Sequence, residues 1–410
     1  MPAQKLSFPA LRNPQFAAFL GSAVLAMMAD NMEHVITYWV MYQRFQSAEL
    51  GGFAVISHWL PFLLGSMTVS RLADRFDPRR FIVFGMTLFM CVSLAWAWLI
   101  ATDTLQIWHA WVLLSLHGIA GTLWNPSTML LLHDIVPAEN LASAVRLNAS
   151  GRMLGMLLGP AIGNLLMLTV SPTPALVMNA LIYLPLLMWA LPRGQRYRVK
   201  PAHLQPGNRG LDDLRLTLRA VGQHRTILYM VLLAGMASML IGNSYQAQMP
   251  GFATLLGHAD PGMAYTLLLG ADAAGALTAG ILLETRSLLT PHPRTALALG
   301  LVWCVALAGF ALGTSYALVL PLLFIAGFVE LSFFSMSQAL VQMNAPPAMR
   351  GRIIGLYSLA GSGMRTFSGI TVGVLGGFIG IRYSLAACAT AVFLLILVLL
   401  YSSGRPQEPT

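Results

Sequence analysis

Long apolar runs alternate with short polar segments along this chain, and the runs have the length of membrane-spanning helices. Polar and apolar residues do not alternate within the runs, which excludes the strands of a membrane barrel. Helices fit the runs, because a helix satisfies its own backbone hydrogen bonds in lipid. The pattern predicts twelve spans, at residues 16–42, 50–72, 81–101, 107–132, 142–169, 174–192, 226–249, 262–284, 295–314, 316–343, 353–379 and 382–402.

The longest polar interruption covers residues 193–225 and contains the helix breakers Pro201, Pro206 and Gly207. It predicts three parts, namely an N-terminal six-helix bundle at 1–192, a cytoplasmic linker with a basic surface segment at 193–225, and a C-terminal six-helix bundle at 226–410. We therefore expect an all-α integral membrane protein with twelve transmembrane helices in two pseudo-symmetric six-helix bundles.

Equivalent residues recur 210 positions apart in the two halves, as expected of a duplicated unit. The pairs are Gly65 and Gly275, Leu72 and Leu282, Asp74 and Glu284, Pro137 and Pro347, Ala138 and Ala348, Gly159 and Gly369, and Gly163 and Gly373. Halves related by an axis along the membrane normal are expected to hold a substrate site between them, at mid-depth in the membrane.

The charged residues follow the same membrane pattern. Only 10% of the residues are charged and 57% belong to the set AVILMFWYC, which leaves too few charges to cover a soluble protein of this length. With a cytoplasmic N-terminus, 20 of the 24 Lys and Arg residues lie on the cytoplasmic side, so we expect both termini there. Residues 1–14 precede an apolar run too long for a cleavable signal. The expected location is the cytoplasmic (inner) membrane.

Several other classes of protein are excluded. The net charge of +9 reflects membrane topology, since no soluble domain presents a basic face to nucleic acid. Cys91, Cys304 and Cys388 lie in three different spans and predict neither a disulfide framework nor a metal cluster. The sequence has no P-loop and no nucleophile–base set, so we expect no enzyme and no cofactor. The expected partners are the lipid bilayer, protons and a small-molecule substrate, and we expect a functional monomer.

The cytoplasmic loop between the second and third spans carries the motif SRLADRFDPRR, from Ser70 to Arg80. Asp74 ends a helix at the membrane surface, where it can pair with Arg75 or with cations of a neighbouring helix. Such a contact, to which Arg79 and the repeated acid Glu284 also belong, is expected to act as a latch that favours the outward-facing state.

The fifth span carries the motif GMLLGPAIGN, from Gly155 to Asn164. Gly155, Gly159 and Gly163, at spacings of four, make a flat helix face on which another helix can pack closely. Pro160 removes one backbone hydrogen bond and permits a kink. The motif is therefore expected to form a helix-packing face.

The 6+6 plan and these two motifs together resemble the major facilitator superfamily over nearly the whole chain. The loop keeps Leu72, Asp74, Arg75 and Arg79 of the superfamily pattern Gly-x-Leu-x-Asp-Arg-x-Gly-Arg-Lys/Arg and departs from it at Ser70, Asp77 and Pro78. The acid at position 77, the fifth-span motif and the segment RGRIIGLYSLAGSGMRTFSG at 350–369 resemble the enterobactin-exporter and macrolide-efflux branch. This resemblance implies export by a drug:proton antiporter, although Leu114 stands where such antiporters commonly carry a fourth-span Arg.

The first span contains the polar segment MADNMEH, from Met28 to His34. A carboxylate at this depth is costly unless it faces water or a partner, so Asp30 and Glu33 are functional candidates. Asp30, Glu33 and His34 share one broad helix face because they are three and four residues apart. Two close carboxylates repel, so one can hold a proton and release it on the other side. We predict that Asp30 and Glu33 couple proton entry to substrate exit, with Asn31 and His34 in the cavity.

Four further charged residues lie at membrane depth, namely Arg152, Asp272, Glu330 and Arg365. Arg152 lies one turn after Asn148 and one turn before the glycine motif. Such charges can form intramembrane pairs that break and re-form as the halves rock, or they can bind an anionic or zwitterionic substrate. We place Asn148, Arg152, Glu330 and Arg365 in the predicted cavity.

These features predict a secondary active exporter of amphipathic small molecules, such as drugs or siderophore-like metabolites, working by alternating access and proton exchange. One alternative is a divalent metal-ion exporter similar to ferroportin, with Asp30 and His34 as ligands. Another is a flippase similar to lysophospholipid transporters, whose first helix carries a similar Asp-Asn pair. A non-transporting membrane sensor or scaffold is a more distant alternative.

Overall fold

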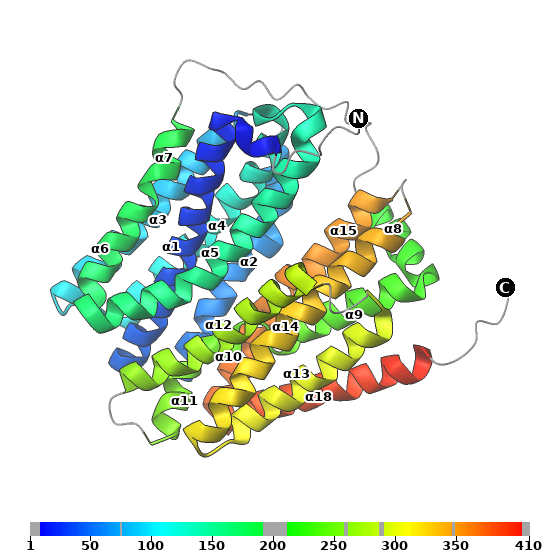
Figure 1. Ribbon diagram of the computed structural model, residues 1–410. Coiled ribbons are helices and arrows are strands. Elements are labelled where there is room, and N and C mark those ends of the chain that lie inside the picture. Colours follow the sequence, from blue (N-terminus) through cyan, green and yellow to red (C-terminus); the bar gives the residue numbers. More distant parts are fainter. Residues whose placement is uncertain are drawn as a thin grey trace. The chain divides into compact units, whose positions relative to one another are not determined.

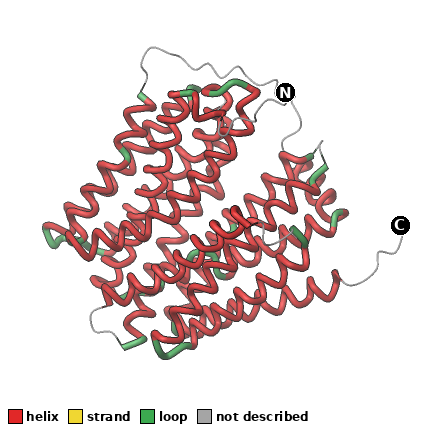
Figure 2. The backbone as a smooth tube through the Cα atoms, viewed as in Figure 1, coloured by secondary structure: helices red, strands yellow, loops and turns green. Residues whose placement is uncertain are grey.

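The computed structural model describes residues 9–73, 76–191, 211–257, 261–286, 291–346 and 349–403. Helix accounts for nearly all of these residues, and none of them forms a strand (Figure 2). The helices up to the linker are α1 (Pro14–Phe45), α2 (Ala48–Ala73), α3 (Pro78–Ala101), α4 (Ile107–Ile135), α5 (Leu141–Val170), α6 (Pro172–Ile182) and α7 (Leu184–Ala190), shown in Figure 1.

The helices after residue 210 repeat this series. They are α8 (Leu211–Gln223), α9 (Arg225–Leu240), α10 (Ser244–Ala247), α11 (Met249–Leu255), α12 (Pro261–Arg286), α13 (Pro293–Leu312), α14 (Tyr316–Asn344), α15 (Arg350–Ser358), α16 (Arg365–Ser368), α17 (Leu375–Ile379) and α18 (Ile381–Ser403). Two π-helical segments, η3 (Leu359–Gly363) and η4 (Gly369–Val374), join α15, α16 and α17 into one rod.

Each of the twelve predicted spans coincides with one of these helices or with consecutive helices. The sixth span is interrupted at Tyr183, two residues before Pro185, and becomes α6 and α7. The seventh continues to Leu255 and is interrupted near Gly242, whose φ of +46° is strained for any residue with a side chain. The predicted linker contains α8, a helix that we did not anticipate.

Nine helices within the described residues are long and apolar enough to cross a membrane. The first helix, α1, is not one of the nine, because its apolar sequence is interrupted by Asp30, Asn31, Glu33 and His34. The helices therefore support an integral membrane protein, and the polar residues within α1 need a chemical explanation.

The chain forms two compact units. The first unit consists of Met1–Val40 and Leu60–Leu204, and the second of Met41–Trp59 and Gln205–Thr410. The first half of α2 belongs to the second unit because Gly52 packs against the backbone of Gly369 and Gly373. A shift of about 210 residues carries the helices from α1 to α7 onto those from α9 to α18, so the order of elements repeats as the sequence repeats.

In the first unit, the glycine face of α5 packs against α1. A Cβ added to Gly155 would lie 2.8 Å from the backbone oxygen of Val24, and one added to Gly159 would lie 2.7 Å from that of Met28. A Cβ on Gly163 would lie 3.2 Å from the Cα of Met32. Three glycines thus let α5 touch the α1 backbone directly beside Asp30 and Glu33.

The second unit uses the same device between α12 and α14. A Cβ on Gly275 would lie 1.9 Å from the backbone oxygen of Phe324, and one on Gly327 would lie 2.0 Å from that of Asp272. No side chain fits at either position unless the two helices separate. The close approach therefore fixes α12 against α14 at the depth of Asp272.

We expect Gly159→Ala to destabilise the protein, because its Cβ would press on Asn31 and on the α1 backbone. Overpacking of this kind costs about 1–3 kcal/mol. The measurement is the melting temperature of the purified protein in detergent. Gly21→Ala is the matched control, since a Cβ on Gly21 meets nothing within 4 Å. Equal melting temperatures for the two variants would contradict the packing role of Gly159.

Candidate functional site

The polar segment of α1 is buried inside the first unit. The exposed fraction is 7% for Asp30 and 1% for Glu33, so neither carboxylate is solvated by bulk water. Their spacing of three residues turns both side chains to the same side of the helix. Each carboxylate must therefore find its hydrogen-bond donors within the protein.

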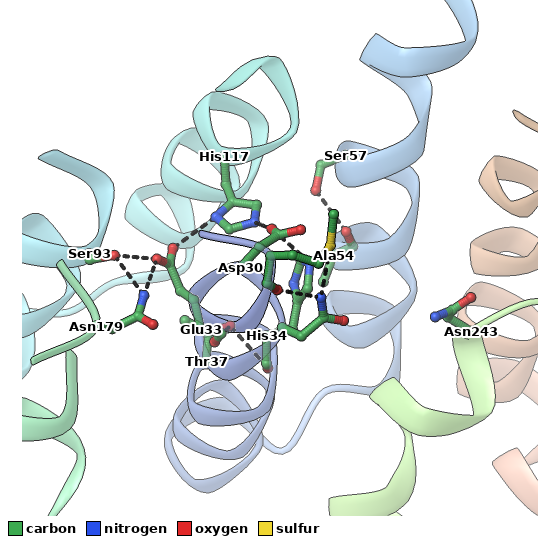
Figure 3. Close-up of polar contacts among 12 residues, drawn as sticks. Asp30, Glu33, His34, Thr37, Ala54, Ser57, Ser93, His117, Asn179 and Asn243 are labelled. Carbon is green, nitrogen blue, oxygen red and sulfur yellow. Dashed lines mark hydrogen bonds and ion pairs between the residues drawn. The ribbon is translucent and has the colours of Figure 1, made fainter. Parts of the chain in front are cut away.

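His117 on α4 lies at hydrogen-bond distance from both carboxylates. Its Nε2 lies 2.7 Å from Asp30 Oδ1, and its Nδ1 lies 2.9 Å from Glu33 Oε1. The imidazole ring thus bridges two side chains that are nearly one helical turn apart (Figure 3). The ring is itself buried, and Phe89 meets it edge-on at a centroid distance of 4.7 Å.

The second oxygen of Glu33 is held by two other helices. Ser93 on α3 and Asn179 on α6 both donate to Glu33 Oε2, with the Asn179 Nδ2 at 3.1 Å. Asn179 Nδ2 also lies 3.1 Å from Ser93 Oγ, which closes a small network on this side of the carboxylate (Figure 3). Four helices therefore converge on one buried acid.

The geometry of this cluster provides a place for one additional proton. A neutral imidazole carries one N–H, yet both ring nitrogens of His117 face a carboxylate oxygen at hydrogen-bond distance. Two such hydrogen bonds need two protons, so either the ring is doubly protonated or one carboxyl group donates to it. If both contacts are hydrogen bonds, the cluster of Asp30, Glu33 and His117 holds one proton more than a neutral histidine and two carboxylates together carry.

His34 lies beside this cluster on the same helix. Its Nε2 is 3.7 Å from Asp30 Oδ1, and its ring lies 4.7 Å from the ring of His117. One ligand atom from each of Asp30, His34 and His117 lies within 4.8 Å of the others. Two imidazole nitrogens and a carboxylate oxygen are donors that suit zinc and other divalent transition metals.

Three other predicted cavity residues of the first unit lie away from the bridged carboxylates. Asn31 Nδ2 donates to the backbone oxygen of Met27, and its Cβ faces Gly159. Arg152 Nη1 donates to Asn125 on α4, although Arg152 remains close enough to Asp30 for an electrostatic attraction. Asn148 is buried with its Nδ2 3.9 Å from the sulfur of Met129.

The second unit contains an acidic cluster of its own. The hydroxyl of Tyr245 lies 3.1 Å from Asp272 Oδ2 and 3.0 Å from Glu330 Oε2. Gln246 Nε2 donates to Asp272 Oδ2 at 2.9 Å. One hydroxyl proton cannot serve two carboxylates, so one of the two acids must carry a proton if both contacts are hydrogen bonds.

Arg365 on α16 lies in the same unit as this second cluster. Its guanidinium carbon is 5.1 Å from the ring centroid of Trp59 and 5.9 Å from that of Phe334. Its Nε donates to the backbone oxygen of Gly361 at 3.1 Å. Glu330 is near enough to attract it electrostatically.

The predicted latch is only partly visible. Asp74 and Arg75 lie outside the described residues, as does the side chain of Glu284. Arg79 is buried and pairs with Asp77, whose carboxylate caps the start of α3 and lies 2.8 Å from Arg79 Nη2. Asp77, at a position where the loop departs from the superfamily pattern, is thus the acid that holds Arg79.

The chain matches one known protein family over most of its length. The model of the Major Facilitator Superfamily matches residues 18–369. The chain belongs to the Major Facilitator Superfamily. The resemblance seen in the sequence is thereby confirmed at the level of the superfamily, whereas its enterobactin-exporter and macrolide-efflux branch stays a prediction.

Solved structures share the fold of this transporter at low sequence identity, and no curated protein matches it. A bacterial homologue of the human lysosomal transporter Spinster, inward-facing and unoccupied, has a TM-score of 0.72 at 14% identity over 98% of this chain and 100% of that chain. The nucleoside transporter NupG gives 0.68 at 14% over 96% and 100%. A D-xylose–proton symporter gives 0.64 at 16% over 95% and 97%.

These findings confirm the predicted fold class of twelve helices in a 6+6 arrangement. The family and its structural neighbours are transporters that work by alternating access, which points to a transporter and not to an enzyme. Family membership and structural similarity do not show that the substrates are drugs or siderophores, that transport is export, or that protons are exchanged.

Sequence reasoning identified the acids of the transporter but missed the side chains that hold them. His117, Ser93 and Asn179 lie 60 to 146 residues from Glu33 along the chain. Asp272 was recognised as a charge at membrane depth but was not placed in a site, and Tyr245 was not assigned to one. Their signal was the same as for Asp30, a polar side chain within an apolar span, but no spacing rule links residues on different helices.

We expect a double-mutant cycle with Asp30→Asn and His117→Gln to be non-additive. Each single variant breaks the same 2.7 Å contact, so the double variant should lose less stability than the sum, with a coupling of about 1–3 kcal/mol. Thermal unfolding of the four proteins in detergent provides the measurement. The control cycle pairs Asp30→Asn with Arg219→Gln on the exposed side of α8 and should be additive. Additivity in the first cycle would remove His117 as the partner of Asp30.

Proposed function

We propose that this transporter exports amphipathic small molecules, such as drugs or siderophore-like metabolites, across the cytoplasmic membrane in exchange for protons. The observation that carries the proposal is the His117 ring between Asp30 and Glu33. A site that holds an additional proton among three ionisable groups in a membrane-spanning bundle is suited to carry that proton from one side to the other.

The chemistry of the cluster explains how coupling would work. Loss of the additional proton leaves one ring nitrogen facing a carboxylate oxygen with no hydrogen between them, so the two lone pairs repel. The buried helices can relieve this repulsion by separating His117 from Asp30, or by admitting a cationic group or water to Asp30. Proton release on one side would thereby be linked to a change in helix arrangement, as proton-driven alternating access requires.

The direction of transport rests on sequence motifs. The fifth-span glycine motif and the segment at 350–369 resemble exporters of the superfamily, which supports export. Asp74, Arg75, Arg79 and Glu284 form the proposed cytoplasmic latch, with both termini in the cytoplasm and a monomer as the functional unit. The packing of Gly155, Gly159 and Gly163 on α1 supports a role for the motif in positioning the proton-binding helix.

We expect Asp30→Asn to reduce substrate-dependent proton flux to the background of protein-free liposomes, because an amide cannot take up and release the proton. The assay uses proteoliposomes that contain a pH-sensitive dye and are exposed to lipophilic cations, organic anions and siderophores. Asp103→Asn, at an exposed acid that follows α3, is the matched control and should transport normally. Substrate movement without proton flux, unchanged in Asp30→Asn, would overturn the antiporter proposal.

A divalent metal-ion exporter is a second candidate, and it is favoured by one specific observation. Asp30, His34 and His117 offer three ligand atoms within 4.8 Å of one another, which no spacing in the sequence could establish for His117. A cation held by these ligands would replace the proton that bridges Asp30 and His117. The same side chains would therefore bind a proton in the first candidate and a metal ion in the second.

If the metal candidate is correct, Zn²⁺, Mn²⁺ or Fe²⁺ should raise the melting temperature of the purified protein, since binding to the native state alone stabilises it. The effect should vanish in His34→Ala, which leaves the contacts between His117 and the carboxylates in place. His224→Ala, at an exposed histidine between α8 and α9, should respond like the wild type. The absence of stabilisation by every first-row divalent ion would eliminate this candidate.

A further inference from the structure

Arg365 is the first residue of α16, a four-residue α-helix that lies between two π-helical segments, η3 and η4. The wider turns of a π-helix are rare and are frequently found at functional sites. A guanidinium at membrane depth also carries a high desolvation cost. Both features single out Arg365 within the second unit.

Aromatic rings hold the guanidinium from two elements. Trp59 of α2 and Phe334 of α14 each present a ring to it, at 5.1 and 5.9 Å. Contact with an aromatic face satisfies the face of a guanidinium but leaves its in-plane N–H groups available. The Nε group is used by the backbone oxygen of Gly361, which fixes the rotation of the side chain.

The two Nη groups remain. Among the described residues, neither Nη1 nor Nη2 of Arg365 donates a hydrogen bond, and Arg365 forms no ion pair. Glu330 attracts Arg365 electrostatically but forms no ion pair with it, and its Oε2 accepts a hydrogen bond from the Tyr245 hydroxyl at 3.0 Å. Arg365, Trp59 and Phe334 are all partly exposed, so a ligand can reach them.

We propose that the Nη1 and Nη2 edge of Arg365 binds the oxyanion of the transported molecule, so that the substrates include organic carboxylates, sulfonates or phosphates with an apolar or aromatic body. Paired N–H groups of a planar guanidinium match two oxygens of such a group. The partly exposed rings of Trp59 and Phe334 offer apolar surface next to the charge. That the bound molecule is also the transported substrate rests on the proposed function. Binding of the anion at Arg365 does not depend on proton coupling.

The test is binding at equilibrium to wild-type protein in detergent, without a pH gradient. The probes are 1-naphthoate, its neutral isostere 1-naphthamide, dodecyl phosphate and inorganic phosphate. We expect 1-naphthoate and dodecyl phosphate to bind, and 1-naphthamide and inorganic phosphate to bind at least about 10-fold more weakly, as loss of a charged hydrogen bond or of the apolar body predicts. This comparison needs no variant and is independent of any folding defect.

Variants then locate the site. Arg365→Gln should weaken 1-naphthoate binding at least about 10-fold, whereas Arg365→Lys should weaken it less, because lysine keeps the charge and loses the planar fork. Arg219→Gln removes an exposed arginine and should bind like the wild type. Equal affinity for 1-naphthoate and 1-naphthamide, or wild-type affinity in folded Arg365→Gln, would overturn the proposal. Inorganic phosphate bound as tightly as the organic anions would overturn the organic substrate class.

Proton flux is measured on the same wild-type preparation, so the two proposals can fail separately. Selective binding of organic anions in a protein that moves no protons would refute proton exchange and leave the Arg365 site intact. Proton flux driven by lipophilic cations alone, with no selectivity for 1-naphthoate over 1-naphthamide, would refute the Arg365 site and leave proton exchange intact.

Discussion

A carboxylate in the middle of a membrane-spanning helix must be protonated, paired or hydrated, and Asp30 and Glu33 meet this requirement through one imidazole ring. His117 contacts both acids, at 2.7 and 2.9 Å, from a helix other than their own. Other residues of the first unit surround these three side chains. Ser93 and Asn179 complete the shell of Glu33, and the ring stack of Phe89 and Tyr183 walls off His117.

Close helix contacts are what make these short distances attainable. The glycines of α5 let it reach the backbone of α1, and Gly85 lets α3 approach α4 within one turn of His117, where a Cβ would lie 3.1 Å from the backbone oxygen of Ala120. In the second unit, Gly275 and Gly327 do the same for α12 and α14, from which Asp272 and Glu330 reach Tyr245. Small residues thus set the geometry in which ionisable residues act.

The internal repeat preserves glycines but not the ionisable residues. Gly65, Gly159 and Gly163 have glycine counterparts 210 positions later, whereas Asp30 and Glu33 correspond to Leu240 and Asn243. Conversely, Asp272 and Glu330 correspond to Phe62 and Ala120. Each half therefore carries its own acidic cluster on different helices. A duplicated scaffold with two unlike sites is consistent with a division of labour between proton binding and substrate binding.

The sequence by itself determined the membrane class, the twelve spans, the duplication and the exceptional polarity of α1, because these depend on hydropathy and on residue periodicity within single helices. It also grouped Asp30, Glu33 and His34, since helical spacing places them on one face. It could not assign His117, Ser93, Asn179 or Tyr245, or predict the segment α8. Those contacts join residues far apart in the chain, and only the packing of helix against helix decides which polar side chains meet at one depth.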